Sequence, residues 1–321
     1  MSTTDWSPQG LTTGSSGSTD FAIVSWNGPA ESRVSIIDTT DLTNSHYRNI
    51  MLVNPTGAGT YEAINLHAGG LALEGHYLYM TDFPAGGFRV FDLNQIRQID
   101  GSNSTCSGKF GKVGSSWCAD GYAYILPEVN SYYTPSTKSD GTAISASCKP
   151  KFSWAGKDTR PATALVLSGE YCAYSATADT DRNCRGDLSG MNGRLYQWPI
   201  GSDSKLVTSN GYVTPTQVFY MNERNVQGVA PIMTKDATGN YQANSYWLSS
   251  TKLSGALFKV SPSSSATQWL YNDSLVPYAP EGIHASVSGS NLWIVTEGQS
   301  GNTNPATGGR VYISIHQADI D

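Results

Sequence analysis

The chain has 321 residues and a formal net charge of −6 at neutral pH. No cluster of Lys and Arg is dense enough for nucleic acid, and no apolar run approaches the ~18 residues of a membrane-spanning helix, so we expect neither as a partner. Only 14 % of the residues are charged, whereas Gly (33 residues) and Tyr (18 residues) are abundant. This composition is typical of many short strands joined by turns.

The cysteines and the N-terminus bear on the cellular compartment. The first ten residues, MSTTDWSPQG, have neither the basic nor the apolar region of a signal peptide. Two cysteine pairs with equal spacing, Cys106/Cys118 and Cys172/Cys184, favour two local disulfides and leave Cys148 over, while five reduced cysteines are the alternative. Two N-x-S/T sequons fit export. We therefore expect a secreted, extracellular protein whose signal peptide is absent from this sequence.

A repeat organises the chain. Each copy starts with a short apolar step, continues with an aromatic-rich strand, and closes with a strand after a polar or Gly-rich turn. In chain order the steps are PQGL from Pro8, AGGLAL from Ala68, ATALVL from Ala162, VQGV from Val226 and PEGI from Pro280. The segments RNIMLV, KFSWAG, TQVFYM and TQWLYN stand just before the later steps, where outer strands belong. This recurrence predicts an all-β fold, a five-bladed β-propeller forming one domain over residues 1–321.

One interval is longer than the others. From Gly69 to Thr163 it measures 94 residues, whereas a propeller blade takes ~40–50. Its segment GYAYILPEVNSYYTP is strand-like. We interpret residues 100–150 as an inserted hairpin or loop region with a disulfide. The alternative is a six-bladed propeller whose extra blade is degenerate around residues 106–157, and a β-sandwich would not explain the ordered recurrence.

Equivalent positions of successive blades form a ring around one axis, so the repeat predicts which residues meet. The ring of first residues reads Gln9, Gly69, Thr163, Gln227 and Glu281. The residues two positions earlier include His67 and Asn225, and the second strands end near Trp26, Asp82 and Glu297. All of these are expected at one mouth of the axial channel.

The chemistry of these side chains suggests a single ligand site. Hydrolysis or β-elimination requires a carboxylate or imidazole within reach of the substrate, so the catalytic candidates are Glu281, His67, Asp82 and Glu297. The candidates for ligand binding are Gln9, Gln227, Trp26, Asn225, Arg160 and Tyr132, with Arg160 placed just ahead of the third inner strand. Glu281 is also a candidate ligand for a divalent metal, Ca or Zn. For each residue taken singly, a structural hydrogen bond or ion pair is the alternative.

Two resemblances follow from these motifs. The copy PEGIHASVSGSNLWIVTEG…GGRVYISI resembles a blade of the gluconolactonase and senescence-marker-protein propellers, in which a Glu of the inner strand binds a divalent metal. That resemblance implies a metal at Glu281, but it covers one copy, and those proteins have six blades. The series WSPQGL, HAGGLAL, NVQGVA and APEGI is similar to secreted propeller proteins of uncharacterised function from actinobacteria and fungi. This second resemblance implies fold and export, and no activity.

Three functions remain open. The first is an extracellular carbohydrate-active hydrolase or lyase with one site at the axial mouth. The second is a metal-dependent lactonase or esterase centred on Glu281. The third is a non-catalytic protein that binds a glycan or another small molecule. The blades differ at every ring position, which argues for one site and a monomer rather than a multivalent lectin. The sequence has no G-x-S-x-G elbow and no Walker or dinucleotide glycine motif.

Overall fold

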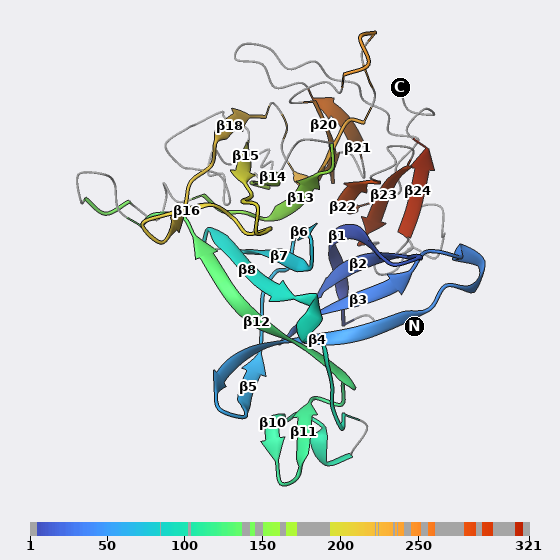
Figure 1. Ribbon diagram of the computed structural model, residues 1–321, viewed down its shortest axis with the longest axis vertical. Helices are drawn as coiled ribbons and strands as arrows, with labels where there is room; N and C mark the ends of the chain where they lie inside the picture. Colours follow the sequence, from blue (N-terminus) through green and yellow to red (C-terminus); the bar gives the residue numbers. More distant parts are fainter. Residues whose placement is uncertain are drawn as a thin grey trace, which may run out of the picture.

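Strands dominate the structure (Figure 1). The computed structural model describes residues 5–83, 85–101, 104–136, 142–144, 150–160, 165–171, 193–221, 223, 225–233, 235, 237–240, 245–251, 256–260, 279–286, 291–297 and 312–316. Within these residues, the regular structure other than strand consists of short 3-10 turns at Leu42–Asn44, Leu93–Gln95 and Ser104–Cys106. No helix in these ranges is long and apolar enough to cross a membrane.

The strands form blades that follow one another along the chain. Blade 1 contains β1 (Ser7–Ser16), β2 (Thr19–Asn27), β3 (Ser32–Asp38) and β4 (Tyr47–Gly57). Blade 2 contains β6 (Leu71–Glu74), β7 (Tyr77–Asp82), β8 (Gly87–Asp92) and β12 (Tyr124–Tyr133). Blade 3 contains β13 (Trp154–Asp158), β14 (Leu165–Gly169), β15 (Arg194–Pro199) and β18 (Gln217–Tyr220). Blade 4 contains β19 (Val226–Pro231), β20 (Tyr246–Ser250) and β21 (Ala256–Val260). Blade 5 contains β22 (Pro280–Ala285), β23 (Asn291–Thr296) and β24 (Tyr312–His316).

Shorter strands decorate the edges. They are β5 (Thr60–Ala63), β9 (Arg97–Gln98), β10 (Phe110–Val113), β11 (Ser116–Ala119), β16 (Thr208–Ser209) and β17 (Tyr212–Val213). β10 pairs with β11 in a hairpin that carries the predicted Cys106–Cys118 disulfide. In Figure 1 this hairpin projects beyond β5, away from the blades.

The first strands of the blades close a ring. β1 contacts β6, β6 contacts β13, β13 contacts β19, β19 contacts β22, and β22 contacts β1. Within each blade the neighbouring strands pair antiparallel. This closed ring confirms the five-bladed propeller.

Apolar side chains fill the space between successive blades. Adjacent residues of a strand face opposite sides of the sheet, and blade 4 shows this in its middle strand. Leu248 packs against blade 3, whereas its neighbour Trp247 packs against Ile283 and Ile294 of blade 5. The last interface joins blade 5 to blade 1, where Val295 packs with Leu11, and this contact closes the circle.

The glycines of the repeat step let the inner strands approach one another closely. A Cβ on Gly70 would lie 1.7 Å from the backbone nitrogen of Ala155, and a Cβ on Gly282 would lie 2.4 Å from that of Leu11. Both contacts are with backbone of the next blade, which cannot move aside. The step therefore requires glycine because the inner strands of adjacent blades touch there.

The structure corrects the strand assignment of the third copy. The inner strand of blade 3 is β13, which begins in the segment KFSWAG that was predicted as an outer strand, and the second strand β14 begins in ATALVL. Both segments are short, apolar and bounded by small residues, so strand pattern alone did not separate them.

The long interval is explained by β12 and the hairpin. The segment interpreted as an inserted hairpin is β12, the outer strand of blade 2, which pairs antiparallel with β8 and parallel with β4. Blades 1 and 2 consequently share one sheet. The described part of residues 106–157 divides among the β10–β11 hairpin, β12 and the start of β13, so the six-bladed alternative is wrong. Cys148, Cys172 and Cys184 lie outside the described residues.

Candidate functional site

One mouth of the axial channel is formed where the inner strands begin. In blades 1, 4 and 5, the ladder between the first two strands shifts register at this point. The irregularities involve Gln9, Gln227 and Glu281. Bulges redirect side chains and are frequent beside functional sites. As predicted, the repeat therefore brings two carboxamides and one carboxyl group to equivalent positions of three neighbouring blades.

Glu281 is almost completely enclosed. Its exposed fraction is 1 %, and one carboxyl oxygen, Oε1, accepts a hydrogen bond of 2.8 Å from Nε2 of Gln227. Burial raises the pKa of this carboxyl well above its ordinary value, and the negative charge of Glu297 raises the pKa further, against a smaller opposing effect of the Gln227 hydrogen bond. Glu281 therefore retains its proton to a higher pH than an exposed glutamate does.

Glu297 is the second carboxyl group at this mouth. It directly follows β23, and its backbone N–H donates a hydrogen bond of 3.0 Å to the carbonyl of Ala279. Its side chain is partly exposed. The structure thus brings a buried carboxyl group and a more exposed one to the same mouth.

The carboxylate of Asp82 is held by side chains of its own blade. It accepts hydrogen bonds from Nε of Arg89 (3.2 Å) and from the hydroxyl of Tyr133 (2.9 Å). Arg89 also binds Glu128 at 2.7 Å. These contacts link β7, β8 and β12 of blade 2 through Asp82. Because the Asp82 carboxylate already serves this structural role, we retain Glu281 and Glu297 as the candidate catalytic carboxyl groups.

His67 lies beside Gly69, the glycine among the inner-strand positions. Its Nδ1 is buried without a hydrogen-bond partner among the described residues, as are Oε1 of Gln9 and Oγ of Ser153. The ring of His67 lies edge-on to Phe83, with centroids 6.2 Å apart. A Cβ added to Gly69 would lie 3.7 Å from Nδ1 of His67. Buried polar atoms of this kind usually bind water or a ligand, so this side of the mouth offers hydrogen-bonding capacity.

Trp26 and Asn225 have defined partners near the mouth. Nε1 of Trp26 donates to Oγ of Ser35 at 2.8 Å. The guanidinium of Arg33 lies over three aromatic rings, those of Trp6, Trp26 and Tyr122. The Cζ atom of Arg33 is 5.4 Å from the centroid of the Trp26 ring. Asn225 has a positive φ of 59° and donates to the hydroxyl of Tyr171 at 2.9 Å.

Arg160 and Tyr132 do not lie where the sequence placed them. Because β13 is the inner strand of blade 3, Arg160 follows its far end, opposite the mouth that carries Glu281. There it forms a buried ion pair with Asp158 and donates to the hydroxyl of Tyr246 at 3.2 Å. Tyr132 is 8 % exposed and packs in the core between blades 2 and 3. Both placements contradict a position at the mouth.

A buried ion pair at the mouth was missed from the sequence. Glu170 follows β14 on the mouth side and accepts hydrogen bonds from Nε (2.8 Å) and Nη2 (2.5 Å) of Arg194. The exposed fraction of Glu170 is 2 %. The signal was an acid directly after one strand and a base at the start of the next. The misassigned third copy hid that signal.

The metal at Glu281 stays a prediction. The described residues contain no group of three or more His, Cys, Asp or Glu side chains that could hold a metal ion. Gln227 turns its N–H group toward the Glu281 carboxyl and donates a hydrogen bond to it, and Glu297 interacts with Glu281 through its charge. We therefore derive no chemistry through a metal at Glu281.

The described strands define a five-bladed propeller. No family model matches the chain, and no curated protein matches it. Among solved structures, it is similar to a Bacteroides uniformis protein provisionally described as a 6-phosphogluconolactonase, at 13 % identity and a TM-score of 0.36, over 94 % of this chain and 69 % of that one. A Bacteroides fragilis protein with the same provisional description matches at 11 % identity and a TM-score of 0.37, over 96 % of this chain and 84 % of that one. Similarity at this level carries no argument about function.

Proposed function

We propose that the axial mouth binds a carbohydrate and cleaves it by acid–base chemistry, with Glu281 as the general acid and Glu297 as the general base. The observation that carries this proposal is a buried carboxyl group, Glu281, whose pKa is raised by burial and by the charge of a more exposed glutamate, Glu297, at the same mouth. A carboxyl group with a raised pKa is suited to act as a general acid near neutral pH.

The proton balance is simple for hydrolysis. Glu281 donates its proton to the oxygen that leaves with one sugar, while Glu297 accepts a proton from the water that attacks the anomeric carbon. If the protein is a lyase, Glu297 instead removes the proton beside a carboxyl group of the substrate, and Glu281 again protonates the leaving oxygen. Both reactions need the same two groups in the same protonation states.

Neighbouring groups suit a hydroxyl-rich substrate. Gln9 and Gln227 are carboxamides that can donate and accept hydrogen bonds, and His67 and Ser153 add buried polar atoms without partners among the described residues. Burial of such atoms is tolerated when a ligand or water satisfies them. We assign these side chains to orientation of the substrate.

The proposal extends to location and assembly. A disulfide such as Cys106–Cys118 persists in oxidising compartments, which supports an extracellular location. The single asymmetric mouth needs no second copy, so we propose that a monomer is the active form.

The test is a polysaccharide panel with matched variants. Glu281→Gln keeps the size of the side chain and an acceptor for Gln227 but cannot donate a proton, and we expect turnover to fall by about 10²–10⁴-fold with substrate binding retained. Glu297→Gln should lose activity similarly. Glu62→Gln is the control, because Glu62 is exposed and its carboxylate accepts a hydrogen bond from Asn54 on the neighbouring strand.

Three results would decide the matter. Cleavage that survives in Glu281→Gln would refute the role of this acid. Products with a new double bond would identify a lyase, and products without one a hydrolase. Saturable glycan binding that weakens in Gln9→Ala, with no cleavage by the wild type, would replace the enzymatic proposal with a non-catalytic binding protein.

A further inference from the structure

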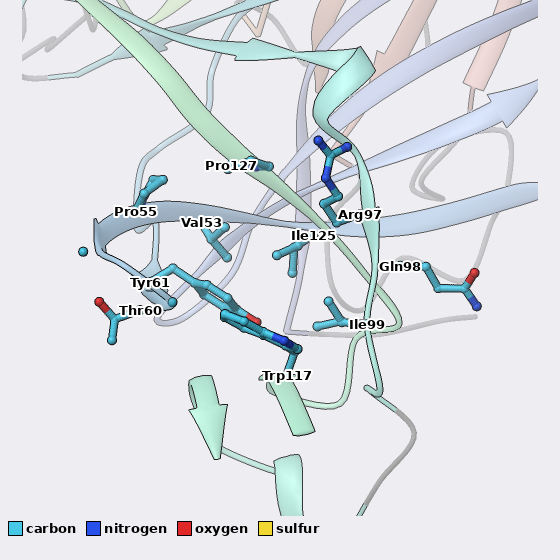
Figure 2. Close-up of a pocket in the computed structure, with 12 residues that line it drawn as sticks. Val53, Pro55, Thr60, Tyr61, Arg97, Gln98, Ile99, Trp117, Ile125 and Pro127 are labelled. Atoms are coloured by element: carbon cyan, nitrogen blue, oxygen red, sulfur yellow. The ribbon is translucent and has the colours of Figure 1, made fainter. Parts of the chain in front are cut away.

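A second candidate site lies outside the propeller ring. An open cavity of about 410 Å³ is bordered by the β10–β11 hairpin, the β4–β5 edge of blade 1 and the start of β12 (Figure 2). This volume falls within the ~300–1,000 Å³ of small-molecule sites. It is remote from the inner strands that carry Glu281, so it does not depend on the function proposed for the axial mouth.

The cavity has an apolar floor. Val53 and Ile125 are buried beneath it, and Ile99 and Pro127 extend this surface. Figure 2 shows the side chains of Val53, Ile125 and Ile99 converging on the same space as the aromatic rings. A surface of this kind gains free energy when a nonpolar group replaces water.

Two parallel aromatic rings form one wall. The planes of Tyr61 and Trp117 are 10° apart, and their centroids lie 6.0 Å from each other. The hydroxyl of Tyr61 donates to the carbonyl of Cys118 at 2.7 Å, next to the disulfide with Cys106. These contacts fix the aromatic wall before any ligand arrives, which lowers the entropic cost of binding.

Glycine at position 59 makes room for the indole. Gly59 has a φ of +77°, and a Cβ there would lie 3.2 Å from the ring of Trp117. Glycine therefore meets two requirements at once: a left-handed backbone and close passage of the aromatic ring. The turn between β4 and β5 is built around the position of Trp117.

The apolar floor carries no charge among the described residues that line the cavity. Arg97 is their one charged member, and its guanidinium donates to the carbonyl oxygens of Asn94 and Ile96 and to Oε1 of Gln95, at 3.0–3.1 Å. Figure 2 shows its guanidinium pointing away from the apolar floor. A charged group placed against the floor would therefore lose hydration without a counter-charge beside it.

We propose that this hairpin cavity binds a small, neutral ligand with a planar aromatic ring, which stacks on Trp117 above Val53 and Ile125. Aromatic rings prefer such offset-stacked contacts. The polar groups at the rim, Thr60 and Gln98, are available for a neutral substituent of the ligand. The hairpin and its disulfide thus serve to build a binding wall.

The experiment uses 2-naphthalenemethanol as the probe and the isoleucine methyl groups as reporters. In the intact protein, titration should shift the NMR signals of Ile99 and Ile125 in a saturable manner. Ile36 and Ile50 line a separate apolar cavity and are the internal control. Trp117→Ala should weaken binding by about tenfold, which corresponds to about 1.4 kcal/mol of lost stacking, whereas Trp117→Phe should retain most of it.

Specific results would overturn the proposal. They are the absence of saturable shifts at Ile99 and Ile125, shifts confined to Ile36 and Ile50, or unchanged affinity in a folded Trp117→Ala variant. Tighter binding of 2-naphthoate, the anion of the same ring system, would overturn the assignment of a neutral ligand. If Trp117→Ala does not fold, the methyl map of the wild type and the Trp117→Phe titration decide the question.

Discussion

Removal of the Glu281 carboxylic acid is expected to change how stability depends on pH. In the unfolded chain this group has the ordinary glutamate pKa of 4.5, whereas burial and the charge of Glu297 raise the pKa in the folded protein. Above about pH 4.5 the unfolded chain releases the proton and the folded protein keeps it. The folded state then binds more protons, so the free energy of unfolding falls as pH rises, until the pH reaches the folded pKa.

The size of the effect follows from proton linkage. A full difference of one bound proton changes the free energy of unfolding by roughly 1 kcal/mol per pH unit. Glu281→Gln cannot ionise and still offers an acceptor oxygen to Gln227, so this contribution disappears. We expect the stability of Glu281→Gln relative to the wild type to increase with pH across the window that opens near pH 4.5.

The assay is urea unfolding of both proteins at several pH values between about 4 and 7. Taking the difference between the two proteins cancels the contributions of titratable groups that do not interact with Glu281. Glu62→Gln, at an exposed glutamate, should show no such trend. A difference between wild type and Glu281→Gln that stays constant or falls with pH would refute the buried, protonated state of Glu281, and with it the proposed general acid.

Three further results are expected. His284 is fully buried, and its pKa is lowered to about 3, mainly by burial and to a lesser extent by the positive charge of Lys157. Between about pH 6.5 and 3 the unfolded chain therefore binds a proton that the folded protein does not, so wild-type stability should fall as pH decreases through this range. His284→Phe should reduce this loss in urea unfolding. Asp158→Asn removes the charge that pairs with buried Arg160, so thermal unfolding should show a loss of about 3–5 kcal/mol, and a loss below 1 kcal/mol would count against the pair. Replacing Cys106 and Cys118 by Ser should cost the hairpin about 2–4 kcal/mol, seen as faster amide exchange in β10 and β11 without change in the blade cores.

The repeat was readable from sequence because each blade is built locally. The strand pairs of one blade are close in sequence, and their hydrophobic alternation and turn residues appear in order along the chain. The glycine of the step was visible for the same reason, since every inner strand meets its neighbour at an equivalent position. These features predicted the fold and the positions of Gln9, Gln227 and Glu281, whereas the spacing of the cysteines predicted the disulfide between Cys106 and Cys118.

The third blade shows where this reasoning failed. Two successive segments, around Trp154 and around Leu167, have the same apolar pattern, and the pattern carries no record of which one faces the axis. The wrong assignment placed Arg160 at the mouth, although the structure puts it at the opposite end beside Asp158. It also hid the ion pair between Glu170 and Arg194.

Sequence by itself therefore determined the class of fold, the glycine steps and the ring that brings Gln9, Gln227 and Glu281 together, because each depends on short-range pattern repeated along the chain. Only the tertiary structure decided the state of those groups and the existence of the hairpin cavity. The raised pKa of Glu281 depends on enclosure by several blades, and the pairing of Tyr61 with Trp117 depends on a hairpin folding back onto blade 1. Both arise from contacts between segments far apart in sequence, for which a local pattern carries no signal.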